Sequence, residues 1–140
     1  TLAKDDKIRR VVLTSGKVYY DLFEARAAAK IDDVAIVRVE QYYPFPAREL
    51  KEELKRYKNA EVVWCQEEPE NMGAWRFIGP RIGDLLEELG RGSLKIGYAG
   101  RQEAASPAAG YLKIHEREQK ALVETALAPA SNEKKKAVNG

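Results

Sequence analysis

Short apolar runs alternate with stretches of helical periodicity along most of the chain. Three runs have the length of a strand and are rich in β-branched side chains: residues 11–13, 34–37 and 62–65. After each run, polar, glycine or proline residues lead into apolar residues at helical spacing, over residues 18–30, 46–57 and 75–89. Apolar strands that are each followed by a helix are typical of a parallel sheet covered on both faces. The pattern predicts an α/β fold, a three-layer sandwich with a mainly parallel, doubly wound sheet.

The pattern changes in the last third of the chain. Leu94, Ile96 and Tyr98 alternate with less apolar neighbours, which predicts a strand near a sheet edge. A last helix is expected from about His115 to Leu127. In the preceding helix, Pro80 predicts a kink or a restart, because proline removes one ladder hydrogen bond.

The domain boundaries follow from these elements. We expect a polar lead-in at residues 1–7, one domain at residues 8–128 and a disordered basic tail at residues 129–140. The chain opens on threonine rather than methionine, which indicates a processed or excised piece.

Right-handed crossovers should bring the strand-to-helix turns to one edge of the sheet. These turns are residues 14–17, 40–46, 66–71 and 99–110. Ligands of open α/β sheets bind outside the carboxyl ends of the strands. The third turn supplies the candidates for a functional turn or an interface: Gln66, Glu67, Glu68, Asn71 and Trp75. The alternative is that these residues only cap the next helix and face solvent.

Charge and cysteine content exclude several classes of function. The net charge is +2, and residues 129–140 account for it with three lysines and one glutamate, which leaves a neutral body. A neutral body argues against nucleic acid as a partner. No apolar run approaches the ~20 residues that cross a membrane. The single cysteine, Cys65, excludes an internal disulfide and ends an apolar run, so we expect a buried apolar role.

No complete catalytic, cofactor-binding or metal-binding set is present in the sequence. The phosphate-loop pattern and the dinucleotide glycine pattern are both absent. One histidine and one cysteine leave a zinc site without ligands. Lys17, after Ser15 and Gly16, could hold one anion at a helix N-terminus, or could be a surface lysine beside a serine cap.

Several long segments carry a family resemblance. They are RRVVLTSGKVYYDL at 9–22, DVAIVRVEQ at 33–41, YPFP at 43–46, WCQEEPENMGAW at 64–75, YAGR at 98–101 and ASPAAGY at 105–111. In this order they closely resemble the C-terminal part of the E1 component of 2-oxoglutarate dehydrogenase, over roughly residues 8–128. Thr14 departs from the family pattern, which usually has cysteine there, and so do residues 102–104.

The resemblance implies a transketolase C-terminal-like domain of a thiamine-diphosphate-dependent enzyme. The family's complete subunit is a homodimer that decarboxylates 2-oxoglutarate and passes the succinyl group to the lipoyl arm of E2, in a complex that also contains E3. Thiamine diphosphate and magnesium would be bound by other domains of the subunit. This chain would supply dimer and interdomain contacts, in the bacterial cytoplasm or the mitochondrial matrix, and be inactive alone.

The resemblance also suggests a regulatory site, because some family members bind acetyl-CoA as an activator. The nearest positions here are Arg38, Gln41 and Arg48, with Lys17 as a further anion candidate. Two other functions remain open: a free-standing nucleotide- or anion-binding regulatory module, and an independent small α/β enzyme. The missing nucleophile–base set disfavours the enzyme.

Large aromatic side chains cluster near the turns and indicate an interface. They are Tyr42, Tyr43, Phe45 and Trp75. We predict that part of this cluster contacts another domain or protomer.

Overall fold

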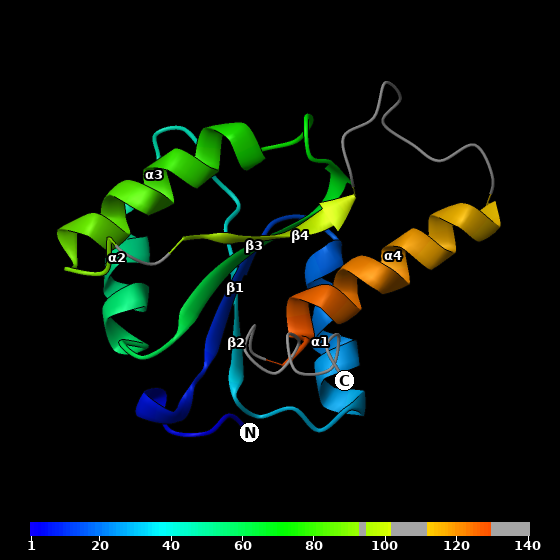
Figure 1. Cartoon of the computed structure of the whole chain (residues 1–140), viewed down its shortest axis with the longest axis horizontal. Helices are drawn as coiled ribbons and strands as arrows, with labels where there is room; N and C mark the ends of the chain where they lie inside the picture. Colours follow the sequence, from blue (N-terminus) through cyan, green and yellow to red (C-terminus); the bar gives the residue numbers. More distant parts are fainter. Residues whose placement is uncertain (93–94, 102–111, 130–140) are drawn as a thin grey trace, which may run out of the picture.

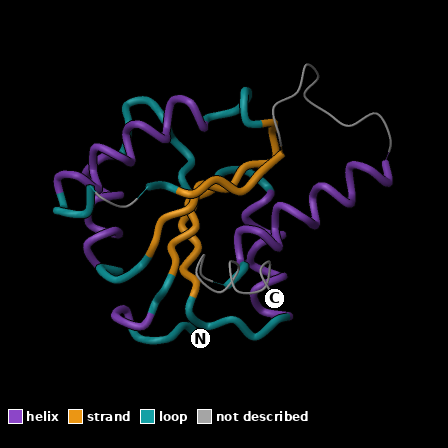
Figure 2. Tube along the Cα trace, viewed as in Figure 1, coloured by secondary structure: helices purple, strands orange, loops and turns teal. Residues whose placement is uncertain are grey.

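The computed structural model describes residues 1–92, 95–101 and 112–129, with the side chains of 112 and 113 left undescribed. The elements along the chain are η1 (Asp5–Lys7), β1 (Arg10–Thr14), α1 (Val18–Ala28), β2 (Val34–Arg38), α2 (Ala47–Arg56), β3 (Glu61–Pro69), α3 (Trp75–Glu88), β4 (Gly97–Arg101) and α4 (Leu112–Leu127). All strand pairs are parallel, and the strand order is β2-β1-β3-β4. The strands lie together in the middle of the molecule with helices around them (Figures 1 and 2).

The sheet separates two apolar cores because successive side chains on a strand point to opposite faces. On β1, Val11 and Leu13 belong to the core beneath α2 and α3, whereas Val12 belongs to the core beneath α1 and α4. Figure 1 shows the same layers, with α2 and α3 on one side of the sheet and α1 and α4 on the other. The predicted three-layer, parallel, doubly wound α/β fold is confirmed.

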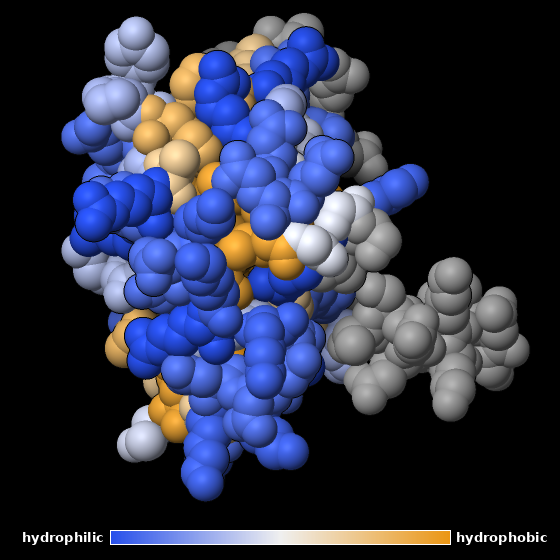
Figure 3. All heavy atoms as spheres, turned by 90° about the vertical axis from the view of Figure 1, so that its left-hand side faces the viewer, coloured by the Kyte–Doolittle hydropathy of each residue, from blue (hydrophilic) through white to orange (hydrophobic). Residues whose placement is uncertain are grey.

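The outer surface over α2 and α3 is mostly hydrophilic, with only small apolar groups between the polar side chains (Figure 3). The helix stripes explain this surface. On α2, Leu50 and Leu54 are buried while most of the neighbouring positions are exposed. This spacing of four residues turns one narrow face of the helix towards the sheet.

Two arginines at the start of β1 hold the C-terminal end of α4. Arg9 donates from Nη1 to the carbonyl oxygen of Ala128 at 2.8 Å, and Arg10 donates from Nη1 to that of Ala126 at 2.8 Å. Arg10 also pairs through Nε with Glu61 at 2.6 Å. The last carbonyls of a helix have no partner within the helix, and cations are favourable there. The two arginines therefore fix α4 to the first strand.

Three local features differ from the sequence prediction. Residues 66–69 continue β3 instead of forming a turn, because Pro69 still pairs with Arg101 of β4 across a register shift. The edge strand β4 begins at Gly97, three residues later than expected. Helix α3 continues through Pro80, so of the two predicted outcomes the restart does not occur and the kink stays a prediction. One missing amide bond does not end a helix that is anchored by buried Ile78 and Ile82.

The strand-to-helix connections do emerge at one edge of the parallel sheet, as predicted, for the part of the chain that is described. The prediction for residues 102–110 lies outside the described residues, and so does the predicted disorder beyond Pro129.

Two helices end in the same cap with different residues at its left-handed position. After α1, Lys30 has φ +56° and the Ile31 amide donates to the Arg26 carbonyl at 3.0 Å. After α3, Gly90 has φ +74° at the equivalent position. Only glycine adopts this conformation without a penalty from Cβ.

Lys30→Gly is therefore expected to raise the free energy of unfolding by about 0.5–1 kcal/mol. The matched variant Gly90→Lys should lower the free energy of unfolding by a similar amount. Urea unfolding followed by circular dichroism measures both. A destabilising Lys30→Gly would show that the lysine side chain contributes more than its backbone strain costs.

Candidate functional site

Gln66 is the centre of the carboxyl-terminal edge of β3. It is 3% exposed, and its amide oxygen accepts hydrogen bonds from Trp64 Nε1 at 2.9 Å and from the Trp75 amide at 3.1 Å. Its amide nitrogen lies 2.9 Å from the Pro69 carbonyl oxygen and 2.8 Å from that of Met72. One buried side chain thus fastens the end of β3, the following turn and the first turn of α3.

The turn after β3 closes tightly over this amide. Gly73 has φ +68°, and a Cβ atom there would lie 2.9 Å from Glu68 Oε2 and 3.0 Å from Gln66 Oε1. A side chain at residue 73 would meet both the strain of positive φ and these oxygens. The turn is therefore held by Gln66 from inside. Gln66 does cap the start of α3, as one reading of the sequence predicted, but it is buried rather than facing solvent.

Glu67 points to the opposite face of the sheet, because it follows Gln66 on the same strand. Its Oε1 accepts a hydrogen bond from Gln119 Nε2 at 2.9 Å, and that nitrogen also donates to Asp21 Oδ2 at 2.9 Å. A single amide group of α4 thereby joins β3 to α1. Glu68 is exposed and, as the next residue on the same strand, points to the face opposite Glu67.

Arg101, the last residue of β4, completes this cluster. It is 8% exposed, and its guanidinium donates to Glu118 Oε2 at 2.9 Å and to Gln119 Oε1 at 2.9 Å. It also donates to the main-chain carbonyl of Glu67. The same guanidinium approaches His115, at 3.4 Å from Nδ1. Arg101, Gln119 and Asp21 were not among the candidate residues predicted from the sequence. Arg101 appeared there only as the last residue of the YAGR segment.

Tyr98 and Cys65 are held in uncharged form beside these networks. The Tyr98 hydroxyl donates to the Arg101 carbonyl oxygen at 3.0 Å, and burial raises the pKa of Tyr98 to about 12. Burial, with a smaller effect of the Glu67 charge, raises the pKa of the Cys65 thiol to about 12. Cys65 is fully buried, and its carbonyl accepts from Thr14 Oγ1 at 2.9 Å. The expected apolar role of Cys65 is confirmed.

The raised pKa of Tyr98 makes stability fall at alkaline pH. The ordinary value is about 10 in the unfolded chain, so above that pH the unfolded state releases a proton that the folded state keeps up to about 12. The free energy of unfolding should therefore decrease as pH rises from about 10 to about 12. Urea midpoints across this range should decrease less steeply in Tyr98→Phe; equal slopes would contradict the assignment.

The predicted aromatic cluster is only partly exposed. Tyr43 is 86% exposed, while Tyr42, Phe45 and Trp75 are half-buried against the core. Trp75 packs on Tyr98 with ring centroids 5.2 Å apart, and Tyr42 meets Trp64 edge-on at 6.3 Å. Of the four, Tyr43 is therefore the most exposed. Contact of this cluster with another domain or protomer stays a prediction.

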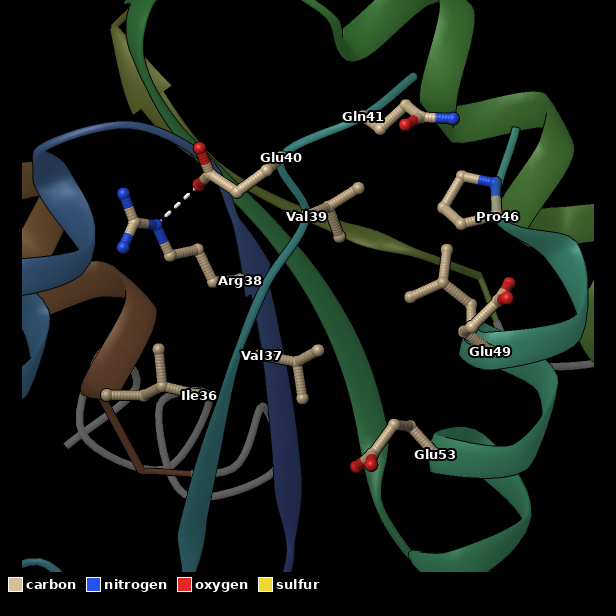
Figure 4. Close-up of a pocket in the computed structure, with 10 residues that line it drawn as sticks. Ile36, Val37, Arg38, Val39, Glu40, Gln41, Pro46, Glu49 and Glu53 are labelled. Atoms are coloured by element: carbon tan, nitrogen blue, oxygen red, sulfur yellow. Dashed lines mark hydrogen bonds and ion pairs between the residues drawn. The ribbon is translucent and has the colours of Figure 1, made fainter. Parts of the chain in front are cut away.

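The regulatory candidates do not gather at one place: Lys17 precedes α1, whereas Arg48 lies on α2, on the other face of the sheet. Arg38 and Gln41 line a groove of about 540 Å³ between β2 and α2, but Lys17 and Arg48 do not. In Figure 4, Arg38 turns away from α2 and pairs with Glu40, whereas Val37 and Val39 face α2. The groove also carries the carboxylates of Glu49 and Glu53, which disfavour an anion.

The polar side chains at this edge satisfy one another. Among the described residues, no group of three or more His, Cys, Asp and Glu side chains could hold a metal ion. In the same residues, no helix is long and apolar enough to cross a membrane. The fold and this edge define a doubly wound α/β domain with a structural polar network at the place where such sheets bind ligands.

Known proteins match this chain over nearly all of its described part. The family model described as 2-oxoglutarate dehydrogenase C-terminal matches residues 1–127. The 2-oxoglutarate dehydrogenase E1 component of Brucella anthropi is 56% identical over 126 residues, which are 90% of this chain and 13% of that protein. The proteins of the same name from Brucella ovis and Brucella suis are also 56% identical, over 90% of this chain and 12% of their own length.

The chain belongs to the 2-oxoglutarate dehydrogenase C-terminal family. It spans 12–13% of the length of these curated relatives. The resemblance noted in the sequence is thereby confirmed.

Proposed function

We propose that the chain acts as the C-terminal domain of a 2-oxoglutarate dehydrogenase E1 subunit, supplying interdomain and dimer contacts. The observation that carries the proposal is the 56% identity to the C-terminal part of E1 components. The site agrees with a structural role, since Gln66, Arg101 and Gln119 bond to this chain's own groups. In this proposal the whole subunit decarboxylates 2-oxoglutarate and passes a succinyl group to E2, in a complex with E3, in the bacterial cytoplasm.

Thiamine diphosphate and magnesium have no assigned ligand among the described residues in this proposal. The polar side chains Gln66, Glu67 and Arg101, at the edge of the sheet where ligands usually bind, are engaged by other groups of this chain. We assign the cofactor to other parts of the longer subunit.

Decarboxylation assays test the proposal. The purified 140-residue chain, supplied with thiamine diphosphate and magnesium, should release no carbon dioxide from 2-oxoglutarate. The whole subunit that contains this sequence should release it. Turnover by the chain alone, or a whole subunit that uses other 2-oxo acids but not 2-oxoglutarate, would overturn the proposal.

An allosteric anion site at Arg38, Gln41, Arg48 and Lys17 stays a separate prediction. Acetyl-CoA titrated into the whole subunit should bind, and Arg48→Ala should weaken that binding. Glu49→Gln is the informative companion variant, because removal of a groove carboxylate should strengthen binding if the groove is the site. No binding, or binding that neither variant changes, would remove the prediction.

A further inference from the structure

Helix α1 carries exposed aromatic rings on its flank beside β2. Tyr20 is 56% exposed and Phe23 is 47% exposed, which is unusual for rings of this size. Tyr19 joins them, with its ring centroid 5.3 Å from that of Tyr20 and 6.1 Å from that of Phe23. The three rings thus form one continuous aromatic surface, which we call the α1 aromatic surface.

Arginines stack on the α1 aromatic surface at both ends. The guanidinium of Arg38 lies 5.3 Å from the Tyr20 ring centroid and 5.4 Å from that of Tyr19. The guanidinium of Arg26 lies 4.9 Å from the Phe23 ring centroid. Arginine and tyrosine are the side chains that dominate binding energy at protein interfaces, because they combine a large apolar face with a polar end.

A hollow of about 560 Å³ adjoins the surface at Phe23. Its lining includes the apolar side chains of Leu2, Ala27 and Ile31 and the cations Arg26 and Lys30. Leu2 is itself exposed. An apolar hollow next to exposed rings extends the patch beyond the isolated apolar side chains that a free surface normally shows.

The charges of this surface select an acidic partner. Glu40 neutralises Arg38, and Asp32 is the carboxylate that lines the hollow. Within the described residues, neither Arg26 nor Lys30 takes part in an ion pair. A second copy docked through the same surface would oppose two surfaces with the same excess of cations, which is less favourable than an acidic partner.

We propose that the α1 aromatic surface and its hollow dock an acidic, partly apolar surface of a neighbouring domain in the same subunit. The identity of the partner rests on the proposed function, because relatives place 87% or more of their length outside the matched region. The partner contributes carboxylates to Arg26 and Lys30 and apolar side chains to Phe23 and the hollow.

Hydroxyl-radical footprinting of the whole subunit and of the 140-residue chain tests the docking. Oxidation of Tyr20 and Phe23 should be about fivefold or more slower in the whole subunit, since packing at the core of an interface matches a protein interior. In the whole subunit, Lys30→Glu should restore much of the reactivity of both rings, and Phe23→Ser should restore much of the reactivity of Tyr20. The matched control Lys55→Glu, an exposed lysine on α2, should leave the protection unchanged.

Urea unfolding of the 140-residue chain shows that each variant still folds. Equal oxidation of Tyr20 and Phe23 in the chain and in the whole subunit would overturn the docking. Protection that persists in Lys30→Glu would overturn the acidic partner, and photo-crosslinks from residue 23 to α1 of a second copy would overturn the neighbouring domain. Decarboxylation, measured on the same samples, reports separately on the proposed function.

Discussion

Replacing Gln66 by leucine should lower the free energy of unfolding by about 3–5 kcal/mol, because it leaves several buried polar groups without partners. The indole N–H of Trp64, the Trp75 amide and the carbonyls of Pro69 and Met72 would all lose the hydrogen bonds that Gln66 now makes. This loss is a large part of the ~5–15 kcal/mol that stabilises a typical domain. Urea unfolding followed by tryptophan fluorescence measures it.

Two further variants make the Gln66 result specific. Gln66→Glu keeps an acceptor for Trp64 and Trp75 but places a carboxyl oxygen against the carbonyls of Pro69 and Met72, so it should be strongly destabilising at neutral pH and less so at acidic pH, where the protonated carboxyl can donate to one of them. Glu70→Gln changes an exposed carboxylate in the same turn and should stay within about 0.5 kcal/mol of the wild type. A decrease in the free energy of unfolding of less than about 1 kcal/mol in Gln66→Leu would mean that water replaces the amide. Gln66 would then not be the residue that holds this edge together.

Arg101→Met should lower the free energy of unfolding by about 2–4 kcal/mol, because Glu118, Gln119 and the Glu67 carbonyl would lose a charged donor. The loss should be concentrated at α4, whose N-terminal half this guanidinium ties to β3. Hydrogen exchange at the amides of residues 115–122 should therefore accelerate more than exchange in β1. Chemical unfolding gives the total effect, and exchange gives its location.

The variant Arg101→Lys keeps the positive charge of Arg101 but changes the geometry of its hydrogen-bond donors. Arg101→Lys should recover only part of the loss, since an ammonium group cannot reach three acceptors in the fixed fork of a guanidinium. Arg56→Met is the surface control: Arg56 pairs with Asp5 at 3.0 Å, and both side chains are about half exposed. This solvent-exposed pair should contribute little to stability. If Arg101→Met and Arg56→Met lowered the free energy of unfolding equally, Arg101 would not be a buried link between α4 and the sheet.

The hydrophobic pattern of the sequence predicts the three layers of the fold, but it does not predict the polar contacts at the end of β3. Apolar runs such as residues 34–37 and 62–65 are visible without any knowledge of their neighbours, because a strand buried on both faces needs them. The continuation of β3 was missed, because Gln66 and Glu67 appear as turn residues in a hydropathy pattern. Each is placed instead by a group from another element, the main-chain amide of Trp75 on one face and the side-chain amide of Gln119 on the other.

The charged network was missed for a related reason. Arg101 lies 17 and 18 residues before Glu118 and Gln119, and Gln119 lies 98 residues after Asp21. No periodicity joins positions so far apart, and their pairing depends on which helix covers which strand. The regulatory candidates show the converse case, in which residues close in the sequence are not brought together. Of Arg38 and Arg48, only Arg38 lines the groove between β2 and α2.

The arginine contacts at the start of β1 also set an order of events during synthesis. Arg9 and Arg10 bond to carbonyls that lie 119 and 116 residues later in the chain. A polypeptide leaves the ribosome amino end first. These guanidinium groups therefore stay solvated until the last helix has emerged. Contacts this distant form late, after the entropy of closing a long loop has been overcome. A nascent chain that stalls before residue 126 would keep the flank of β1 uncovered and open to chaperones.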